Sequence, residues 1–474
     1  MKKKSLSKEI KKIICDNIES STSHGFPNII RNESILVNSM WIICIFISSS
    51  YCAYCLIKSF REYFSYEIDT KLIFNRVSQV EFPTVTFCNK IATDFKRDNN
   101  EIETLKKGQT ESLKDLKDLN NFRDFYTAID FWFKRFTISV KNIGGFEIEK
   151  MLLSCSFNFK QCHASDFKLL NSSTFGFCYQ FNANSTHIQK VSSPGKKAGL
   201  SLELFIGYNS KKYDFYKSYG AHLFIHNSST IPSSEFDGIS LSTGHETDII
   251  VNEILFKKLP KPHSNCVEDS YSNVSFDSDL YRETIKLFKK YGQKTCLNLC
   301  FHKNIFEKCG CYYPDRNIVE DFSQVCDEII YDKCYMPFIS TYGESKASQN
   351  CFEKCPDECE SVKYNLQISQ ADFPTEFYAD FLMNYDATLK NSSRNFSSYK
   401  NVKKSTLAVN VYFDDIGYTL VEEKPSKTLE QLVADIGGLL GLCIGISFLS
   451  VAEIFDSILK IILLLFEKRI VQPK

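Results

Sequence analysis

Residues 435–456, with the sequence DIGGLLGLCIGISFLSVAEIFD, place carboxylates inside a segment that is otherwise apolar enough to cross a membrane. An ordinary membrane anchor contains no such groups. Asp435, Glu453 and Asp456 would each cost a few kcal/mol in hydrocarbon, so we expect them to face protein or water. Carboxylates within a membrane usually mark an ion pathway, and the chemistry that they predict here is attraction of cations.

Glycines in the same segment permit close packing of helices. Gly437, Gly441 and Gly445 form two overlapping G-x-x-x-G steps, which let helix backbones approach closely. On one continuous helix, with about 100° per residue, a narrow stripe would contain only small or acidic residues. These are Gly438, Gly441, Gly445, Ala452 and Asp456. The pattern predicts a narrow cation pore built from several copies of the helix. The alternatives are helix packing alone, and carboxylates that extend towards the membrane interface.

The apolar segment over residues 429–466 is too long for one straight membrane span. As a helix rising ~1.5 Å per residue, it is nearly twice as long as the ~30 Å hydrocarbon layer. It must therefore tilt strongly, project from the membrane or break. Irregular backbone at membrane depth is tolerated only where it is buried in protein or lines a wet cavity. We predict a second transmembrane helix over 429–466, with Gly445 and Ser447 as the point where it breaks.

The first transmembrane helix is predicted over residues 38–57, NSMWIICIFISSSYCAYCLI, which is uncharged and about one bilayer thick. The segment starts far from the N-terminus and lacks a small-residue cleavage site. We therefore expect a retained helix rather than a signal peptide. Cys52 and Cys55 form a C-x-x-C pattern, which we interpret as packing thiols because no metal or redox partner accompanies them.

Basic residues predict that both termini are cytoplasmic. The tail over residues 1–37 has six lysines in its first twelve positions, and the tail over 467–474 has three basic residues. The segment over 58–428 is then extracellular. It contains fourteen of the nineteen cysteines, an even number that allows complete disulfide pairing in an oxidising compartment.

Glycosylation signals lie in the same segment, although such tripeptides are frequent by chance in a chain rich in Ser and Asn. The six sequons begin at Asn171, Asn184, Asn227, Asn273, Asn391 and Asn395. The formal net charge of the chain is zero, which argues against nucleic acid as a partner.

The extracellular segment mixes strands and helices. Residues 199–208, GLSLELFIGY, and residues 221–228, AHLFIHNS, are predicted to form strands, and residues 281–291 have the period of an amphipathic helix. Ten of the fourteen cysteines lie between Cys266 and Cys359. We predict an α+β membrane protein with two transmembrane helices and a large disulfide-rich extracellular domain.

Catalytic motifs are missing from the sequence. It contains no G-x-S-x-G, no H-E-x-x-H and no P-loop, and His245-Glu246 lacks a second histidine four residues later. We therefore expect no enzyme activity, no cofactor and no metal site.

Four features resemble one known family. Residues 23–25, Ser-His-Gly, resemble the cytoplasmic His-Gly motif of that family. Residues 82–89, FPTVTFCN, resemble its signature after the first helix, and residues 445–447, Gly-Ile-Ser, resemble its G-x-S filter. The fourteen extracellular cysteines match its framework in number and order. The chain thus resembles a subunit of the degenerin/epithelial sodium channel family, which includes the acid-sensing and peptide-gated sodium channels.

The resemblance implies an architecture and a cellular location. Family members are trimers in the plasma membrane, with an extracellular domain of palm, β-ball, finger, thumb and knuckle above a pore lined by the second helix. The thumb would span about residues 266–359. The implied disulfides are Cys88–Cys178, Cys155–Cys162, Cys266–Cys359, Cys296–Cys355, Cys300–Cys351, Cys309–Cys334 and Cys311–Cys326.

The resemblance also implies roles for residues of the pore. Gly445, Ile446 and Ser447 would form the selectivity filter, and the lower half of the pore helix would come from a neighbouring subunit. Glu453 and Asp456 would form acidic rings below the filter. Rings of carboxylates and backbone carbonyls favour cations over anions, but the preference for sodium over potassium is inferred from the family. Sodium is the permeant ion, not a cofactor.

Further implied roles concern block and gating. Gly441 aligns with the family's amiloride-blocking position, and Ala434 with the degenerin position where bulky residues hold channels open. His24 and Gly25 would re-enter beneath the filter as part of gating. Membrane lipid and other family subunits, in a homotrimer or a heterotrimer, are the implied partners.

The gating stimulus is the least constrained property. Acid-sensing members carry a histidine where Ile68 stands, and His263 replaces an aromatic residue that in relatives couples to the equivalent of Tyr66. His263 either confers some pH sensitivity or is a packing residue. Together with a general likeness of residues 199–204 and 351–369 to peptide-gated members, this favours an extracellular ligand such as a neuropeptide. Proton gating, constitutive or mechanical gating, a non-conducting accessory subunit and a disulfide-rich receptor stay open, whereas an ATP-gated two-helix channel lacks these motifs.

Overall fold

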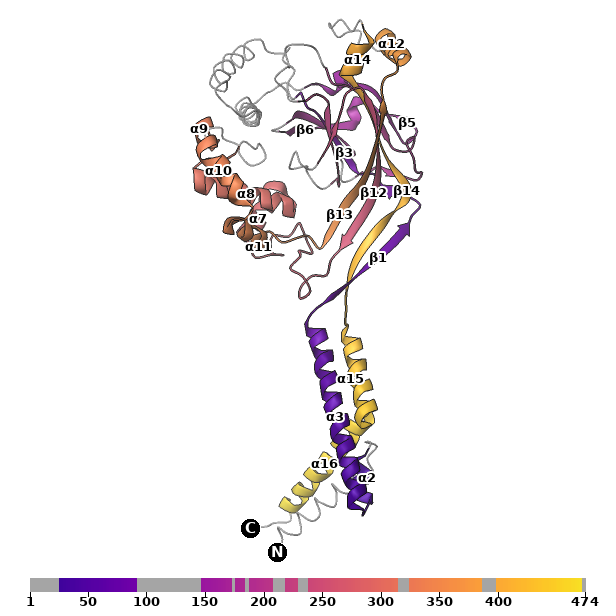
Figure 1. The fold of residues 1–474 in the computed structure, drawn as a ribbon, viewed down its shortest axis with the longest axis vertical. Coiled ribbons are helices and arrows are strands. Elements are labelled where there is room, and N and C mark those ends of the chain that lie inside the picture. The colour runs from indigo at the N-terminus through magenta and orange to yellow at the C-terminus, as the bar shows by residue number, and fades with distance from the viewer. Residues whose placement is uncertain are drawn as a thin grey trace. The chain divides into compact units, whose positions relative to one another are not determined.

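The computed structural model describes residues 25–91, 146–172, 175–183, 187–207, 218–228, 238–313, 324–385 and 398–470. The chain forms two compact units (Figure 1). The central unit comprises Lys71–Glu422, and the terminal unit comprises Met1–Thr70 together with Glu423–Lys474. The second unit thus joins two segments from opposite ends of the sequence.

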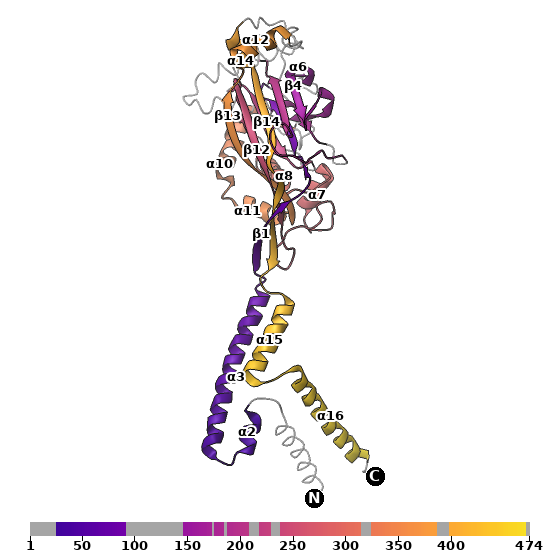
Figure 2. The same ribbon diagram turned by 90° about the vertical axis from the view of Figure 1, so that its right-hand side faces the viewer.

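The terminal unit is helical. Its described helices are α2 (Phe26–Arg31), α3 (Ile35–Phe64), α15 (Leu429–Ile444) and α16 (Phe448–Ile470). Helices α3 and α15 lie side by side in both views (Figures 1 and 2). Within the described residues, α3 is the one helix that is long and apolar enough by itself to cross a membrane. It extends beyond the predicted 38–57 at both ends, by the apolar residues 35–37 at its start and by the mostly charged and aromatic residues 58–64 at its end.

The central unit is built on a seven-stranded sheet with the order β13-β12-β14-β9-β4-β5, in which β1 also pairs with β14. Strands β12 and β14 run parallel, whereas β12 and β13 form an antiparallel pair over thirteen residues. The strands are β1 (Ile68–Arg76), β4 (Leu152–Phe157), β5 (Lys160–Gln161), β9 (Leu200–Phe205), β12 (His245–Lys257), β13 (Glu360–Asp372) and β14 (Thr406–Pro425).

A second sheet has the order β11-β10-β3-β7-β6, and β2 pairs with β8 in a two-stranded ribbon. Both strands predicted over residues 199–208 and 221–228 are confirmed, as β9 and β10. The strands are β2 (Val80–Glu81), β3 (Thr84–Asn89), β6 (Phe167–Ser172), β7 (Gly176–Phe181), β8 (Lys190–Val191), β10 (Ala221–His226) and β11 (Ile239–Leu241).

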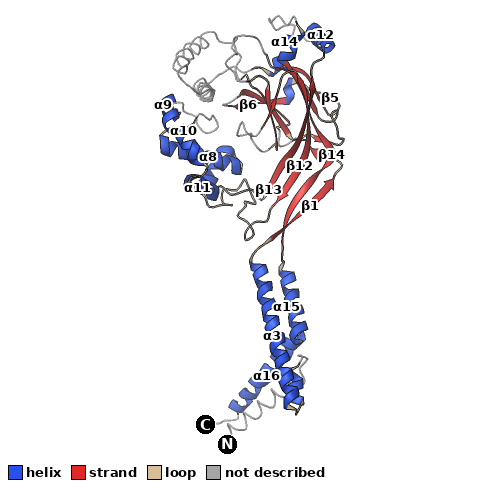
Figure 3. Ribbon diagram, viewed as in Figure 1, coloured by secondary structure: helices blue, strands red, loops and turns tan. Residues whose placement is uncertain are grey.

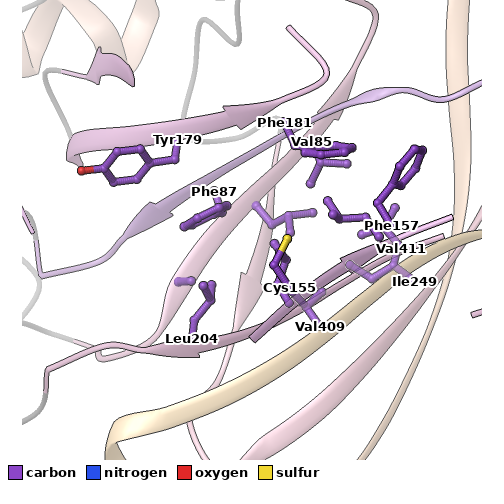
Figure 4. Close-up of a cluster of buried hydrophobic side chains, with 14 of the residues drawn as sticks. Val85, Phe87, Cys155, Phe157, Tyr179, Phe181, Leu204, Ile249, Val409 and Val411 are labelled. Atoms are coloured by element: carbon purple, nitrogen blue, oxygen red, sulfur yellow. The ribbon is translucent and has the colours of Figure 1, made fainter. Parts of the chain in front are cut away.

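One hydrophobic core joins these sheets. Figure 4 shows Phe87 and Phe181 from the second sheet close to Phe157, Leu204 and Val409 from the first. All five side chains are buried. The signature strand β3 is buried along its whole length, so the FPTVTFCN motif serves the packing of this core.

The helices between residues 279 and 354 gather apart from the strands, whereas α12 and α14 lie at the end of the long strands (Figure 3). The predicted helix over 281–291 is confirmed as α7. It starts two residues earlier than predicted, because Ser278 caps its start, and ends three residues earlier. The helices are α6 (Ile148–Met151), α7 (Asp279–Phe288), α8 (Gln293–Cys309), α9 (Glu328–Ile330), α10 (Met336–Tyr342), α11 (Lys346–Lys354), α12 (Glu376–Tyr385) and α14 (Tyr399–Ser405), with a 3₁₀ turn over Ala164–Asp166 and a π-helical turn over Tyr331–Tyr335.

Seven disulfides cross-link the central unit, and five of them hold the helices between Cys266 and Cys359. The pairs are those that the family resemblance implies: Cys88–Cys178, Cys155–Cys162, Cys266–Cys359, Cys296–Cys355, Cys300–Cys351, Cys309–Cys334 and Cys311–Cys326. The free cysteines of the described residues, Cys44, Cys52, Cys55 and Cys443, all belong to the terminal unit.

Candidate functional site

The interruption between α15 and α16 is the centre of the candidate site. Helix α15 ends at Ile444, and Gly445 adopts the left-handed conformation with φ of 73°. The Gly445 amide donates to the Gly441 carbonyl oxygen at 3.1 Å, and the Ile446 amide to the Leu440 carbonyl oxygen at 3.2 Å. This pairing closes the helix with a glycine, which alone adopts that conformation without steric cost.

A second cap starts the next helix. The Ser447 amide donates to Ser450 Oγ at 3.1 Å, and the Ser450 amide donates to Ser447 Oγ at 3.3 Å. Residues 445–447 are therefore non-helical, at the point where the sequence predicts a break. A glycine that stops one helix and a serine that caps the next explain why the break lies there.

The break corrects one prediction from the sequence. A single stripe from Gly438 through Gly441 to Ala452 and Asp456 requires a continuous helix, but the chain leaves helical geometry at Gly445. The glycines of α15 and the acidic residues of α16 therefore belong to separate helices. Their rotation about the helix axis is not linked by a period of 3.6 residues.

Asp435 lies at the contact between α3 and α15. Its Oδ2 atom is 2.8 Å from Lys427 Nζ and accepts a hydrogen bond from Ser59 Oγ at 3.1 Å. Lys427 Nζ also lies 3.1 Å from Glu62 Oε2 and donates to Ser59 Oγ at 2.6 Å. The hydrogen bond to Asp435 raises the pKa of Lys427, which therefore stays charged at neutral pH. We name these four residues the Lys427 cluster.

Small polar groups continue this contact along the two helices. Ser48 Oγ donates to the Cys443 carbonyl oxygen at 2.6 Å, and Cys52 Sγ lies 3.8 Å from the Leu439 carbonyl oxygen. The free thiol of Cys443, on the facing side of α15, lies near that of Cys52. Cys52 is 1% exposed and packs against α15, as predicted for a packing thiol.

The other acidic residues lie on α16. Glu453 and Asp456 are one turn apart, and both side chains are exposed in the single chain. Asp456 Oδ2 lies 2.5 Å from Lys460 Nζ, four residues later on the same helix. The three predicted acidic residues therefore lie on two helices. Asp435 on α15 contacts α3, whereas Glu453 and Asp456 on α16 are exposed.

Positions assigned to block and gating lie on α15. Ala434 is exposed and Gly441 is partly exposed in the single chain. A methyl group added at Gly437, Gly438 or Gly441 would meet nothing within 4 Å among the described residues. This face of α15 is therefore available to a neighbouring helix.

The His-Gly motif is described in part, since His24 lies outside the described residues. Gly25 has φ of 88° and precedes α2. A Cβ there would lie 2.9 Å from Ile45 Cγ1, so α2 turns back against α3 at a position where a side chain does not fit.

The two residues predicted to couple in gating belong to different units. Tyr66 has a positive φ of 52° and its ring contacts that of Phe64 edge-on at 6.5 Å. The His263 amide donates to the Pro260 carbonyl oxygen at 3.1 Å in a turn before Cys266. Their coupling stays a prediction.

Three of the six sequons are described. Asn171 and Asn273 are exposed, whereas Asn227 is partly buried. Asn184, Asn391 and Asn395 lie outside the described residues. Exposure at Asn171 and Asn273 leaves room for a glycan at both positions.

Sequence reasoning missed Lys427 and Glu253. Lys427 precedes α15 and meets Asp435 eight residues later, a spacing that no helical period predicts. Glu253 pairs in register with Tyr364 of β13, next to an irregularity in the β12–β14 ladder. Burial, and then the nearby charge of Glu81, raises the pKa of Glu253 to about 7. An acidic residue at an inward-facing strand position is the signal that would have found it.

Comparisons with known proteins identify one family. The model of the family described as amiloride-sensitive sodium channel matches residues 18–456. The chain is 25% identical to acid-sensing ion channel 1 of Gallus gallus over 92% of this chain and 82% of that protein. It is 25% identical to the bile acid-sensitive ion channel of Homo sapiens over 94% and 86%, and to the epithelial sodium channel subunit beta of Mus musculus over 67% and 49%.

A solved structure of a proton-activated chloride channel aligns with 90% of this chain and 97% of its own, at a TM-score of 0.32 and 6% identity. That similarity is too low to support an inference. The match to the sodium-channel family extends from the N-terminal tail to Asp456 and so includes both α3 and the interruption at 445–447. The chain therefore belongs to the amiloride-sensitive sodium channel family, the degenerin/epithelial sodium channels, and is a channel subunit rather than an enzyme.

Proposed function

We propose that this chain is a subunit of a trimeric, sodium-selective and amiloride-sensitive channel of the plasma membrane. The observation that carries the proposal is the interruption of the C-terminal apolar helix at residues 445–447. Non-helical backbone at membrane depth is stable where it lines a wet cavity. Three copies would place three such backbones around one ion path.

The chemistry of this path follows from the groups that it offers. Backbone carbonyls and Ser447 hydroxyls replace part of the hydration shell of a cation. Carboxylates at Asp435, Glu453 and Asp456 raise the local cation concentration and disfavour anions. Gly441, one turn before the break, gives amiloride a space without side chains.

Two spans per subunit are supported by helix lengths. Helix α3 has 30 residues, or ~45 Å, which exceeds the ~30 Å hydrocarbon layer. Helix α15 has 16 residues, or ~24 Å, so it needs the segment beyond the break to complete a crossing. Large apolar side chains such as Phe46 and Ile47 are exposed on α3 and would contact lipid. Both termini are then cytoplasmic, and the central unit is extracellular.

An extracellular ligand, with a short neuropeptide as the favoured class, is the proposed gating stimulus. Ile68 replaces the histidine of acid-sensing members, which supports a ligand over protons. Family subunits are the proposed partners, in a homotrimer or a heterotrimer, because the similar proteins include separate subunits of the epithelial sodium channel.

The test is expression of this chain alone, with current recorded under voltage clamp. We expect an amiloride-blocked inward current on application of an amidated peptide, with a reversal potential that follows the sodium gradient. Surface labelling is the control for expression. A chain that reaches the surface and passes no current with peptides, acid or any bile acid would instead be an accessory subunit.

Acid is a second candidate stimulus, supported by Glu253. Its pKa of about 7 means that mild acidification protonates a partly buried carboxyl group in β12. If protons gate the channel through this group, Glu253→Gln should mimic the acid form and abolish most of the acid response. An unchanged acid response in the variant would exclude Glu253 as the sensor.

The pH dependence of the unfolding free energy is a second test of the Glu253 pKa. The folded protein keeps the Glu253 proton up to about pH 7, whereas the unfolded chain loses it near pH 4.5. The associated stability is therefore fully present below pH ~4.5 and is lost as pH rises to ~7. Glu253→Gln should raise the unfolding free energy at pH 8 by about 1–2 kcal/mol, after allowance for solvent screening. Chemical unfolding of the purified channel at pH 5 and pH 8 measures this.

A further inference from the structure

Lys427 occupies the junction where β14 leads into α15. Its side chain is 12% exposed, and Thr428 follows it as the first residue of a capping box. The Thr428 amide donates to Gln431 Oε1 at 2.9 Å, and the Gln431 amide donates to Thr428 Oγ1 at 3.2 Å. Because this reciprocal pair fixes the start of α15, the backbone position of Lys427 is also fixed.

In the Lys427 cluster, each polar group acts as a hydrogen-bond donor or acceptor in a way that its chemistry allows. The ammonium group donates to Ser59 Oγ and pairs with the carboxylates of Asp435 and Glu62. Ser59 accepts from Lys427 and donates its own hydrogen to Asp435. A hydroxyl group can do both at once, so the network is internally consistent.

The charges of the cluster explain why it joins two helices. Ser59 and Glu62 lie three residues apart on α3 and so share one face, whereas Asp435 lies on α15. The Lys427 ammonium stands between a carboxylate from each helix. Without it, the two carboxylates would face each other across the α3–α15 contact. Lys58, the other described cation beside them, is 3.9 Å from Glu62 and well exposed.

We propose that Lys427 is a positioning residue that holds Asp435 against α3 in the resting channel. This proposal rests on the proposed channel function. The ammonium group occupies the place that an external cation would take beside Asp435, so this carboxylate does not act as the outermost charge of the ion path at rest. Opening separates the Lys427 cluster and releases Asp435.

The position of the cluster agrees with this role. Ala434, the residue assigned to gating, precedes Asp435 on the same turn of α15. A change of packing at Ala434 and a loss of charge at Lys427 would therefore act on the same end of the α3–α15 pair. Both should favour the state in which the two helices separate.

The functional test compares Lys427→Met with Lys427→Arg in the full-length channel. We expect Lys427→Met to raise the ligand-independent current by about fivefold or more, and Lys427→Arg to restore the resting level. Lys58→Met is the matched control, because it removes an exposed cation from the same helix end, and it should leave the resting current unchanged. Equal effects of the Met and Arg variants would overturn the proposal.

A double variant isolates the pairwise interaction. If Lys427 acts through Asp435, then Lys427→Met should add little to Asp435→Asn. Independent, multiplicative effects on the resting current would contradict a shared contact. An increase of resting current in the Lys58→Met control would instead indicate a general effect of surface charge.

Chemical cross-linking separates this proposal from the channel function itself. A carbodiimide activates a carboxyl group, the Lys427 amine attacks it to form an amide, and the reagent takes up the lost water and leaves as a urea. Mass spectrometry of the purified full-length protein should find Lys427 joined to Asp435 or Glu62. If the link forms but the channel passes no current, the proposed function is rejected and the Lys427 cluster stands. If the channel conducts and the reagent joins Lys58 to Glu62 but does not link Lys427, the Lys427 cluster is rejected.

Discussion

Helices α15 and α16 follow each other in the sequence but differ in how they are held. Helix α15 contacts α3 through the Lys427 cluster near its start and through Ser48 and Cys52 near its end. The contacts described for α16 are within the helix and its cap, such as the Asp456–Lys460 pair. Figure 2 shows α15 beside α3, with α16 departing after the break.

This difference indicates that the helices on the two sides of residues 445–447 have different roles. The outer helix is fixed to a neighbour by hydrogen bonds, so its displacement has a defined energetic cost and suits it to gating. The inner helix exposes carboxylates one turn apart, which suits it to permeation. Substitutions on opposite sides of residues 445–447 should then change different properties.

Ala434→Phe should have the largest effect, on gating. In a closed trimer the added volume overpacks a tight contact, at a cost of about 1–3 kcal/mol. A cost borne only by the closed state shifts the closed/open ratio by about five- to more than a hundredfold. We expect a standing amiloride-blocked sodium current without ligand. Ala434→Ser is the control of similar size, and a Phe variant that reaches the surface but stays shut would refute this position of the gate.

Gly445→Ala should have the next largest effect, on the break itself. A residue with a side chain in the left-handed conformation costs about 1–2 kcal/mol, which favours extension of the helix through the filter. We expect the sodium-to-potassium permeability ratio, measured from reversal potentials, to fall towards one. Gly437→Ala is the control, because an added methyl group there meets nothing within 4 Å among the described residues. An unchanged ratio at Gly445→Ala would separate the break from selectivity.

Glu453→Gln and Asp456→Asn should have the smallest effect, confined to permeation. One carboxylate at ~4 Å attracts a sodium ion by about 1 kcal/mol even at the dielectric constant of water, or about fivefold in local concentration. We expect unitary sodium conductance to fall by up to that factor, with the ligand concentration for half-maximal current unchanged. A shift in ligand sensitivity without a change of conductance would reverse the roles assigned to α15 and α16.

The sequence predicts the break because its causes are local. A glycine and a serine within a segment that is too long for one span suffice to place it. The stripe of small and acidic residues was wrong for the same reason, because a period of 3.6 residues has meaning only within one helix. Strands β9 and β10 were predictable because each is a short apolar-rich run, and both are largely buried in the structure.

The Lys427 cluster was not predictable, because its contacts depend on how distant segments pack. Lys427 lies outside any helical repeat, and Ser59 is far away in the sequence. Lys427 resembles the other basic residues that flank an apolar helix. Only the packing of α3 on α15 turns an ordinary flanking lysine into a bridge between two carboxylates.

Cys52 of α3 and Cys443 of α15 are free thiols that lie near enough to interact across the same pair of helices. A membrane-permeant two-electron oxidant would remove one hydrogen from each and join the helices by a covalent bond that a reducing agent could later cleave. Such a bond would restrain helix separation reversibly, without an engineered cysteine. Currents recorded before oxidation, after it and after reduction would measure how much of channel opening requires these two helices to move apart.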